Sequence, residues 1–434
     1  MWSSVCVFGR HPTLTARQLE RCRGFPLHLS IDIPCTAFQV EEEESTSPIT
    51  REARMIRAQQ EQVRSISATV GDCRAFHRLF GSDWPNLEEL IWIDVCPSWL
   101  RIHEEVPTAP WGVHQTPKLR YLSAQQGIAW WLASTTSLTA LKLEGPMDTD
   151  LLGFLRANPR LKSLELVDLD LQPSLANTTS FDLPDVTRVV MYDVEYAHLF
   201  LCVTFPSLRH LVVDPLRCLG LRKIAWGQLQ FPPTLTALEI QYLTHPFQDR
   251  ISITGSDEAN DSSLSLTESA GSLSSTPMIQ ALSNALLSRV TSLSIGGGAV
   301  GFWSLLPSTL ICTLVSGLPH LWYLSVLSHH LTLTIVDHLC NHLLDCPELR
   351  ILSLTLVRST CSMSSRSLSG FLSDRASSGR WVHRVDCVIL EAPGEDLEEA
   401  KRVWEFLSRD WGFAGCLRCN CVGEVRKAGV RLCS

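Results

Sequence analysis

The sequence predicts an α/β fold in which short parallel strands and helices alternate along a repeating unit. Three observations support this. A phrase made of a Pro or small polar residue, one further residue and then L-x-x-L-x-hydrophobic recurs ten times. Helix-compatible runs lie between most copies, and most copies follow one another at intervals of 19 to 32 residues. One such unit cannot bury its own leucines, so neighbouring units must stack and share a core.

The copies are most easily followed by their first apolar residue. The clearest spans residues 158–171, where Leu161, Leu164 and Leu166 have the L-x-x-L-x-L spacing of a leucine-rich repeat. We therefore predict a leucine-rich-repeat solenoid, with a curved parallel sheet on its concave face and helices and irregular loops on its convex face. The ten first apolar residues are Leu87, Leu119, Leu138, Leu161, Val186, Leu208, Leu235, Val290, Leu321 and Leu349.

Residues 1–80 precede the repeats and are predicted to form an N-terminal cap region. Alternation of apolar and polar residues indicates strands at 27–33 and 63–68, whereas residues 2–8 alternate only loosely. Helical spacing or helix-forming composition indicates helices at 13–23 and 51–62. Residues 81–248 then hold the first series of repeats.

The interval from Leu235 to Val290 is 55 residues, far longer than the others. It contains residues 249–277, of which nine of 29 are Ser. This composition predicts a disordered insertion. Repeats resume over 278–358, a second Ser-rich loop is predicted at 359–380, and residues 381–434 should form a final strand (381–390), a capping helix (395–411) and a tail.

Composition and charge narrow the class of protein. The net charge is −8 and the basic residues are scattered, which argues against nucleic acid as a partner. The first residues lack a signal-peptide pattern, and no apolar run approaches the roughly 18 residues that span a bilayer. We expect a cytoplasmic or nuclear protein without a membrane partner, in which the 16 cysteines are mostly buried free thiols.

Three patterns invite a catalytic or metal-binding interpretation. Residues 296–301 read G-x-G-x-x-G, but Pro307 interrupts the expected helix and no acid lies at 318–324, so a flexible repeat loop is favoured. His338 and His342 stand four apart without the Glu of H-E-x-x-H, and residues 416–421 form C-x-x-C-x-C without a second cysteine pair. We predict no cofactor, no metal and no enzymatic activity.

The predicted binding surface is the concave sheet face. Residues between the leucines point outward from adjacent parallel strands about 4.8 Å apart, which makes a surface for an extended partner. Mixed charges and aromatic residues suit recognition of a protein. The nine candidate protein-binding residues are Lys142, Glu144, Glu165, Arg188, Tyr192, His210, Asp214, Glu239 and Gln241.

The sequence resembles the fungal, especially mushroom-type (basidiomycete), F-box proteins with irregular leucine-rich repeats. The resemblance is carried by the repeated P-x-L-x-x-L phrase, by residues 26–31 (Pro-Leu-His-Leu-Ser-Ile) and by residues 2–5 (Trp-Ser-Ser-Val), which are similar to the segment that follows the F-box. It implies a substrate receptor of cullin-type ubiquitin ligases, whose F-box binds a Skp-type adaptor and whose repeats select the target. The F-box itself is missing before Trp2, so the adaptor is expected only if an F-box lies upstream.

The expected function is therefore a non-enzymatic protein-recognition module related to ubiquitin-ligase receptors. The alternative is a stand-alone leucine-rich-repeat scaffold or inhibitor with no link to ubiquitin. An enzyme that uses the glycine loop or the His pair is a third and more distant hypothesis.

Overall fold

The structure is a computed structural model. It describes residues 3–7, 11–33, 48–70, 83–94, 116–125, 136–145, 151–169, 180–192, 199–214, 229–243, 250–269, 275–284, 289–297, 308–327, 329–342, 345–357, 373–375, 377–379, 382 and 384–390. The chain divides into two compact units. Unit 1 holds Met1–Leu208 and Arg217–Ile224, and unit 2 holds Arg209–Leu216 and Ala225–Ser434.

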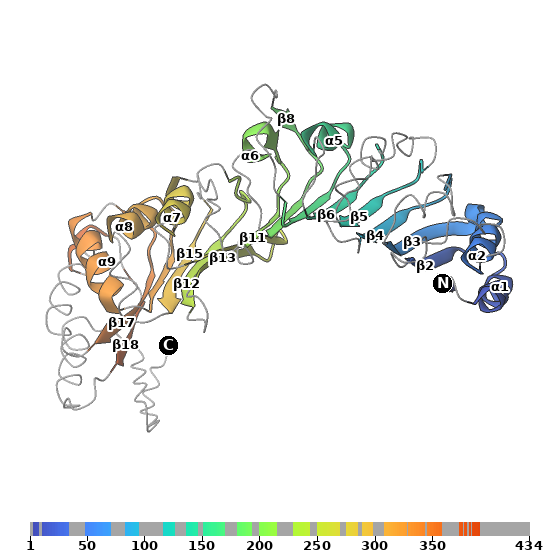
Figure 1. Ribbon diagram of the computed structural model, residues 1–434. Helices are drawn as coiled ribbons and strands as arrows, with labels where there is room; N and C mark the ends of the chain where they lie inside the picture. The colour runs from blue at the N-terminus through green and yellow to red at the C-terminus, as the bar shows by residue number, and fades with distance from the viewer. Residues whose placement is uncertain are drawn as a thin grey trace, which may run out of the picture. The chain divides into compact units, whose positions relative to one another are not determined.

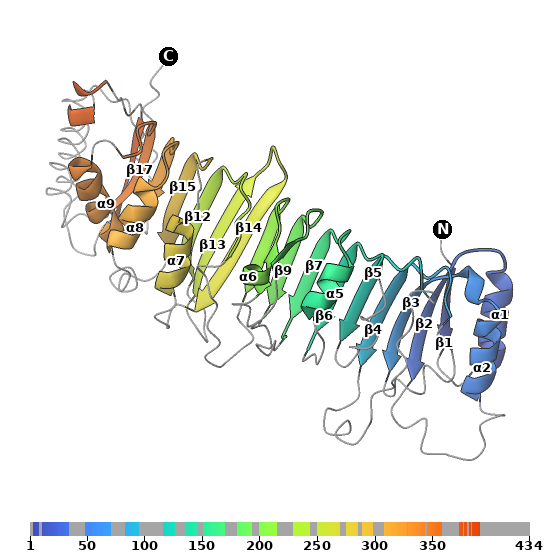
Figure 2. The ribbon, with the colours of Figure 1, turned by 90° about the horizontal axis from the view of Figure 1, so that it is seen from above.

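Unit 1 is built on parallel strands that lie side by side in nearly the order of the sequence (Figures 1 and 2). Their order is β1 (Ser3–Val7), β2 (Leu27–Ile33), β3 (Val63–Val70), β4 (Glu89–Asp94), β5 (Tyr121–Gln125), β6 (Ala140–Glu144), β7 (Ser163–Val167) and β9 (Arg188–Tyr192). A separate two-stranded parallel sheet pairs β8 (Phe181–Asp182) with β10 (Val203–Thr204). The helical segments are α1 (Pro12–Arg21), α2 (Pro48–Arg57), η2 (Gln60–Gln62), α5 (Leu151–Ala157) and α6 (Leu199–Cys202).

Unit 2 contains parallel strands and one antiparallel hairpin. The strand order is β11 (His210–Asp214), β14 (Ser262–Ser269), β13 (Arg250–Asp257), β12 (Ala237–Leu243), β15 (Ser292–Gly297), β16 (Tyr323–Val326), β17 (Ile351–Val357) and β18 (Arg384–Leu390). Its helices are α7 (Ser275–Asn284), α8 (Ser308–Ser316) and α9 (His329–Asn341). The predicted α/β class and the predominance of parallel strands are confirmed in both units.

The repeated phrase explains how each parallel strand begins. The first apolar residue and the one three positions later are buried in all ten copies, as Leu161 and Leu164 are at 0% exposure. In seven copies the backbone N–H of the first apolar residue closes a turn on the carbonyl three residues earlier, as Leu161 does on Asn158 at 3.1 Å. Pro at the second position of such a turn has the φ that the turn requires. The phrase therefore combines a turn with the start of a strand.

Neighbouring repeats are joined by backbone hydrogen bonds just before each strand. In unit 1 the N–H of Lys162 donates to the carbonyl of Thr139 at 2.7 Å, and the N–H of Thr187 donates to the carbonyl of Lys162 at 2.9 Å. In unit 2 the N–H of Trp322 donates to the carbonyl of Thr291 at 2.7 Å. These bonds place equivalent residues of successive strands in register.

The predicted disordered insertion at 249–277 is wrong, because most of it forms ordered structure. β13 and β14 form an antiparallel hairpin, in which β13 pairs with β12 and β14 pairs in parallel with β11. Every second residue in the middle of each strand is a buried apolar side chain. These side chains are Ile251, Ile253, Leu264 and Leu266, each at 2% exposure or less. Serine content alone suggested disorder, whereas the alternation of these few apolar residues is the pattern of a half-buried strand.

The second Ser-rich segment, predicted as a loop at 359–380, is described only at 373–375 and 377–379. Residues 373–375 are helical rather than irregular, and Arg375 is only 1% exposed. Its guanidinium donates to the carbonyl oxygens of Asp345 (3.4 Å), Cys346 (3.1 Å) and Pro347 (3.2 Å). The predicted strand at 381–390 is confirmed as β18, and the predicted capping helix at 395–411 lies outside the described residues.

The N-terminal predictions agree with the structure. The strands predicted at 27–33 and 63–68 are confirmed as β2 and β3, and β1 lies within the loosely alternating residues 2–8. The helices predicted at 13–23 and 51–62 correspond to α1 and to α2 with η2. Four of the five described free cysteines are buried, namely Cys22, Cys202, Cys312 and Cys346. Burial raises the pKa of the Cys346 thiol to about 12, so this side chain stays a neutral, unreactive thiol.

Helices in both units lie on one face of the strands. Figures 1 and 2 show α5 over β6 and β7, and α7, α8 and α9 over the strands of unit 2. The residues of α5 that face inward are Leu151, Leu152, Phe154 and Leu155, all buried. No described helix covers the opposite face, which we call the polar face of each unit.

Candidate functional site

The polar face of unit 1 consists of the strand side chains that alternate with the buried leucines. β5 and β6 both have the pattern intermediate, buried, intermediate, buried, intermediate. Because the strands are parallel and in register, equivalent positions form rows across the sheet. The central row from β5 to β9 is Ser123, Lys142, Glu165 and Val190, and the row beside it is Gln125, Glu144, Val167 and Tyr192.

Glu165 is the centre of a charged group on this face. Lys142 Nζ donates to its Oε1 at 2.6 Å, and Arg188 Nη1 lies 3.7 Å from its Oε2. The hydrogen bond to Glu165 raises the pKa of Lys142 above its ordinary value of 10.5, and the negative charges of Glu165 and Glu144 act in the same direction against burial. Arg188 is the most exposed of the three charged side chains, at 46%. Two cations, one on each of the strands that flank β7, therefore share one carboxylate.

Glu144 has a neighbour that the sequence analysis missed. Gln125 Nε2 on β5 donates to Glu144 Oε1 at 3.0 Å. Gln125 occupies the same position after its leucine as Glu144 does, so extending the repeat pattern to the β5 copy would have found it. Ser163 was missed as well, and Arg188 Nη1 lies 3.5 Å from its Oγ.

A second polar group on unit 1, also missed, crosses the first strands. His28 Nδ1 lies 2.7 Å from Ser65 Oγ, and Ser65 Oγ donates to Glu89 Oε2 at 2.9 Å. The three residues are in register on β2, β3 and β4, with Ser65 fully buried between them. In a nucleophilic triad the His lies between the Ser and the carboxylate, whereas here the Ser donates directly to the carboxylate. The arrangement binds three strands together.

In unit 2 the candidate residues lie on two strands that are not neighbours. His210 and Asp214 are on β11, whereas Glu239 and Gln241 are on β12. The hairpin of β13 and β14 stands between them, so the expectation that all candidate strands are adjacent is wrong for this pair. The long interval in the repeat spacing contains the two additional strands.

The partners of these residues come partly from the hairpin. His210 Nδ1 lies 2.9 Å from Ser263 Oγ, and its Nε2 lies 3.8 Å from Asp261. Gln241 Nε2 donates to Glu239 Oε1 at 2.6 Å. Glu239 otherwise stands in a row of hydroxyl side chains in register, comprising Ser265, Thr254, Ser294, Ser325 and Ser353.

The structure thus brings five candidates together in unit 1, namely Lys142, Glu144, Glu165, Arg188 and Tyr192 on β6, β7 and β9. It places His210 with Asp214, and Glu239 with Gln241, at separate positions of unit 2. All nine occupy positions outside the buried core. The polar face of unit 1 is the densest grouping of candidate residues and is the candidate functional site.

His338, near the end of α9, is held in a hydrogen-bonded cluster, and His342 directly follows the helix. His338 Nε2 lies 2.8 Å from Ser316 Oγ and 3.1 Å from Asp345 Oδ2, and Ser316 Oγ donates to Asp345 at 2.5 Å. The rings of His338 and His342 stack with centroids 4.5 Å apart. A single ring nitrogen meets both Ser316 and Asp345, whereas a catalytic triad uses both nitrogens of the His. Within the described ranges, no group of three or more His, Cys, Asp or Glu side chains could hold a metal ion.

The G-x-G-x-x-G pattern begins at the end of β15, and its residues 298–301 lie outside the described part of the chain. At Gly296 an added Cβ would lie 2.8 Å from Leu327 Cδ1, so the absence of a side chain there allows close packing. This gives Gly296 a structural role. The cysteines at 416–421 also lie outside the described residues.

No protein-family model matches the chain, and a search of curated proteins finds no match. Among the described helices, none combines the length and apolar character needed to cross a membrane.

Proposed function

We propose that this chain is a leucine-rich-repeat solenoid that recognises a protein through the polar face of its sheet. The single observation that carries the proposal is the in-register array of charged, amide and aromatic side chains on β5, β6, β7 and β9 of unit 1. The repeat assignment is supported by the burial of both leading apolar residues in every copy of the phrase. It is also supported by backbone hydrogen bonds between successive copies within each unit, as from Lys162 to Thr139 in unit 1 and from Trp322 to Thr291 in unit 2.

The charges of the polar face favour a protein partner over a polyanion. Lys142 and Arg188 contribute two positive charges, and Glu144 and Glu165 contribute two negative charges, so the centre of the face is close to neutral. A nucleic-acid site requires a cluster of unbalanced basic residues, because its affinity comes from neutralising phosphates. A balanced pattern instead gives specificity for a partner with complementary charges.

The rows also define the shape of the partner. Adjacent strands lie about 4.8 Å apart and present side chains at regular intervals, so a segment that crosses the strands meets a new side chain at each step. Arg188 is well placed to make such a contact, because it is nearly half exposed and lies 3.7 Å from Glu165. A partner carboxylate could pair with Arg188 while Lys142 keeps Glu165 neutralised.

The resemblance to fungal F-box proteins with leucine-rich repeats supports a narrower proposal. In that interpretation the polar face selects the target of a cullin-type ubiquitin ligase, and a Skp-type adaptor is a partner only if an F-box lies upstream. A repeat protein that binds the same target without an adaptor is the alternative. The two proposals are separated by expressing the chain together with any coding sequence found upstream of Met1. Co-purification of a Skp-type adaptor would favour the ubiquitin-ligase receptor over the repeat protein without an adaptor.

Affinity capture with charge-reversed variants tests the recognition proposal. The full chain, Arg188→Glu and Glu239→Arg are used to capture partners from the source organism. Arg160→Glu is the matched control for Arg188→Glu. Arg160 is exposed in the turn before β7, and its substitution changes the net charge by the same amount. We expect Arg188→Glu to lose the principal partner by at least about tenfold while Arg160→Glu retains it, as for a hot-spot residue. An unchanged set of partners for both polar-face variants would contradict the proposal.

A further inference from the structure

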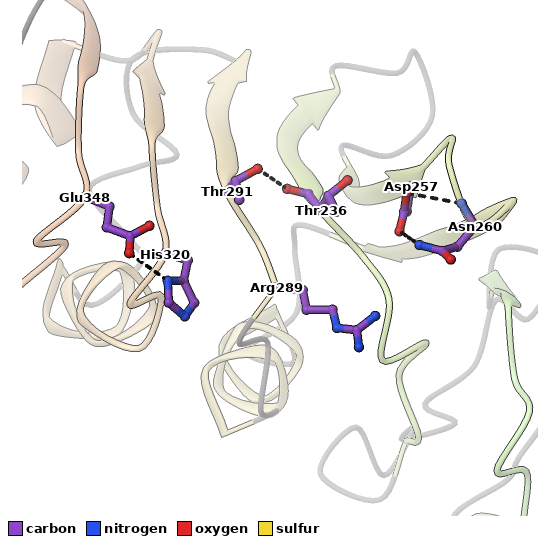
Figure 3. Close-up of a pocket in the computed structure, with 7 residues that line it drawn as sticks. All are labelled: Thr236, Asp257, Asn260, Arg289, Thr291, His320 and Glu348. Atoms are coloured by element: carbon purple, nitrogen blue, oxygen red, sulfur yellow. Dashed lines mark hydrogen bonds and ion pairs between the residues drawn. The ribbon is translucent and has the colours of Figure 1, made fainter.

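Unit 2 has an open pocket that lies apart from the polar-face residues described above. It has a volume of about 580 Å³, within the usual range for ligand sites. The hairpin turn that joins β13 to β14 forms one side, and the residues just before β12, β15, β16 and β17 form the remainder (Figure 3). The pocket therefore combines residues of the hairpin with residues that precede four parallel strands.

The two carboxylates of the pocket already have partners. Asp257 is only 4% exposed, and its Oδ1 accepts the backbone N–H groups of Ala259 (3.0 Å) and Asn260 (3.3 Å). Its Oδ2 accepts Nδ2 of Asn260 at 2.6 Å, so the carboxylate holds the hairpin turn. Glu348 lies 3.0 Å from His320 Nδ1, and both side chains are 53% exposed.

The hydroxyl groups have also used their protons. Thr236 Oγ1 donates to the carbonyl of Ser256 at 3.2 Å, and Thr291 Oγ1 donates to the carbonyl of Thr236 at 3.3 Å. Each oxygen keeps lone pairs that accept further hydrogen bonds. The carboxamide oxygen of Asn260 is a further acceptor, since its nitrogen holds Asp257.

Arg289 differs from the other residues of the pocket. It is exposed, and it has no hydrogen bond or ion pair with any residue in the part of the chain that the structure describes. Figure 3 shows its guanidinium below Thr236, on the side of the pocket where the hairpin turn lies. Its five N–H donors remain available to a ligand.

We infer that this pocket binds a carboxylate carried by a partner polypeptide, with Arg289 as its main ligand. A guanidinium pairs with a carboxylate through two parallel hydrogen bonds, which fixes the orientation of the ligand. The acceptor oxygens of Asn260, Thr236 and Thr291 suit the amide N–H groups that flank a carboxylate in a peptide. The nearby negative charges of Asp257 and Glu348 disfavour a phosphate dianion more than a carboxylate, because repulsion grows with the ligand's charge.

The carboxylate could come from an acidic side chain or from a chain terminus, and small probes distinguish these sources. The probes are N-acetyl-aspartate amide for the side chain and N-acetyl-glycylglycine for the terminus, each compared with its neutral amide. Binding to the full-length chain is followed by the NMR signal of the Arg289 side-chain N–H group, which is assigned by its loss in Arg289→Gln. Inorganic phosphate and N-acetyl-lysine amide are titrated in parallel.

We expect at least one carboxylate probe to saturate the Arg289 signal and the neutral amides to leave it unchanged. In a competition assay, Arg289→Gln should weaken binding by at least about tenfold, and Arg289→Lys should also weaken it, because an ammonium lacks the paired donors. Arg209→Gln, which changes an exposed arginine of unit 2 outside the pocket, should bind within about twofold of the original chain.

Three results would overturn the inference. These are equal binding of the neutral amides, tighter binding of phosphate or of the lysine probe, and failure of both carboxylates to bind a chain whose circular dichroism is unchanged. The test is independent of the polar-face proposal, because Arg188→Glu leaves the pocket intact and Arg289→Gln leaves the polar face intact.

Discussion

Replacing Asn158 with Ala should destabilise unit 1 strongly. Asn158 lies between α5 and β7 and has 0% exposure. Its Nδ2 donates to the carbonyl of Phe154 at 3.0 Å, and its Oδ1 accepts the N–H of Leu138 at 3.2 Å. One side chain thus joins the end of α5 to the start of the preceding repeat.

The magnitude follows from the two backbone groups that lose their partner. A buried backbone donor or acceptor without a hydrogen bond costs about 1–3 kcal/mol. Since Asn158→Ala leaves one of each, and a small cavity partly admits water, we expect a loss of about 2–4 kcal/mol in the free energy of unfolding. The local turn is expected to persist, because the backbone bond from Leu161 to the carbonyl of Asn158 does not use the side chain.

The assay is urea unfolding followed by the fluorescence of Trp84 and Trp92, which are buried in unit 1. Asn86→Ala is the matched control, because the Asn86 side chain makes its bonds to Glu61 and Lys118 at an exposed position. The control should change the free energy of unfolding by less than about 1 kcal/mol. Equal losses for the two substitutions would refute the reasoning that the cost of Asn158→Ala comes from buried backbone groups that lose their hydrogen bonds.

Three further predictions concern other parts of the fold. Glu165→Gln should lower the pKa of Lys142 toward 10.5, as measured from the side-chain NMR signals of Lys142. Because the pKa of Lys142 is raised in the folded chain, the stabilisation that its ion pair gives is complete below pH 10.5 and is lost as the pH rises through the folded-state pKa. An unchanged pKa would mean that the ion pair does not form in solution. Gly255→Val should cost about 1–3 kcal/mol in urea unfolding, because even a Cβ there lies 3.0 Å from Leu238 Cδ2; no loss would show that the packing relaxes freely. Arg375→Lys should lower the thermal midpoint, because an ammonium cannot span the three carbonyls that the guanidinium meets, and a midpoint equal to that of the original chain would contradict this.

The repeated phrase was sufficient to predict the ten strands that follow its copies, because its physical content is local. A Pro in a turn is followed by two apolar residues that stand three positions apart. This spacing identifies where a strand starts and which of its side chains are buried. The candidates Lys142, Glu144 and Glu165 followed from the same alternation. The contacts between these side chains depend on the register between neighbouring strands. The sequence indicated this register only because the copies of the phrase are similar and align with one another.

The hairpin and the pocket could not be predicted in this way. β13 and β14 contain few buried apolar side chains, and the many serines around them obscured the alternation of apolar and polar residues. Because Asp257 and Asn260 reach the pocket only through that hairpin, the pocket near Arg289 was missed with it. The burial of Arg375 was also missed, since its partners are backbone carbonyls that leave no signature in the sequence.

Hydroxyl-radical footprinting of the chain with its captured partner is the most direct test of recognition through the polar face. Tyr121 and Tyr192 lie on that face of unit 1, on β5 and β9. Leu14 and Phe25 are 48% and 55% exposed in the N-terminal region of the same unit and serve as internal references. We predict that the partner protects both tyrosines and leaves Leu14 and Phe25 as reactive as before. Protection of Leu14 and Phe25 with both tyrosines unchanged would contradict the central claim.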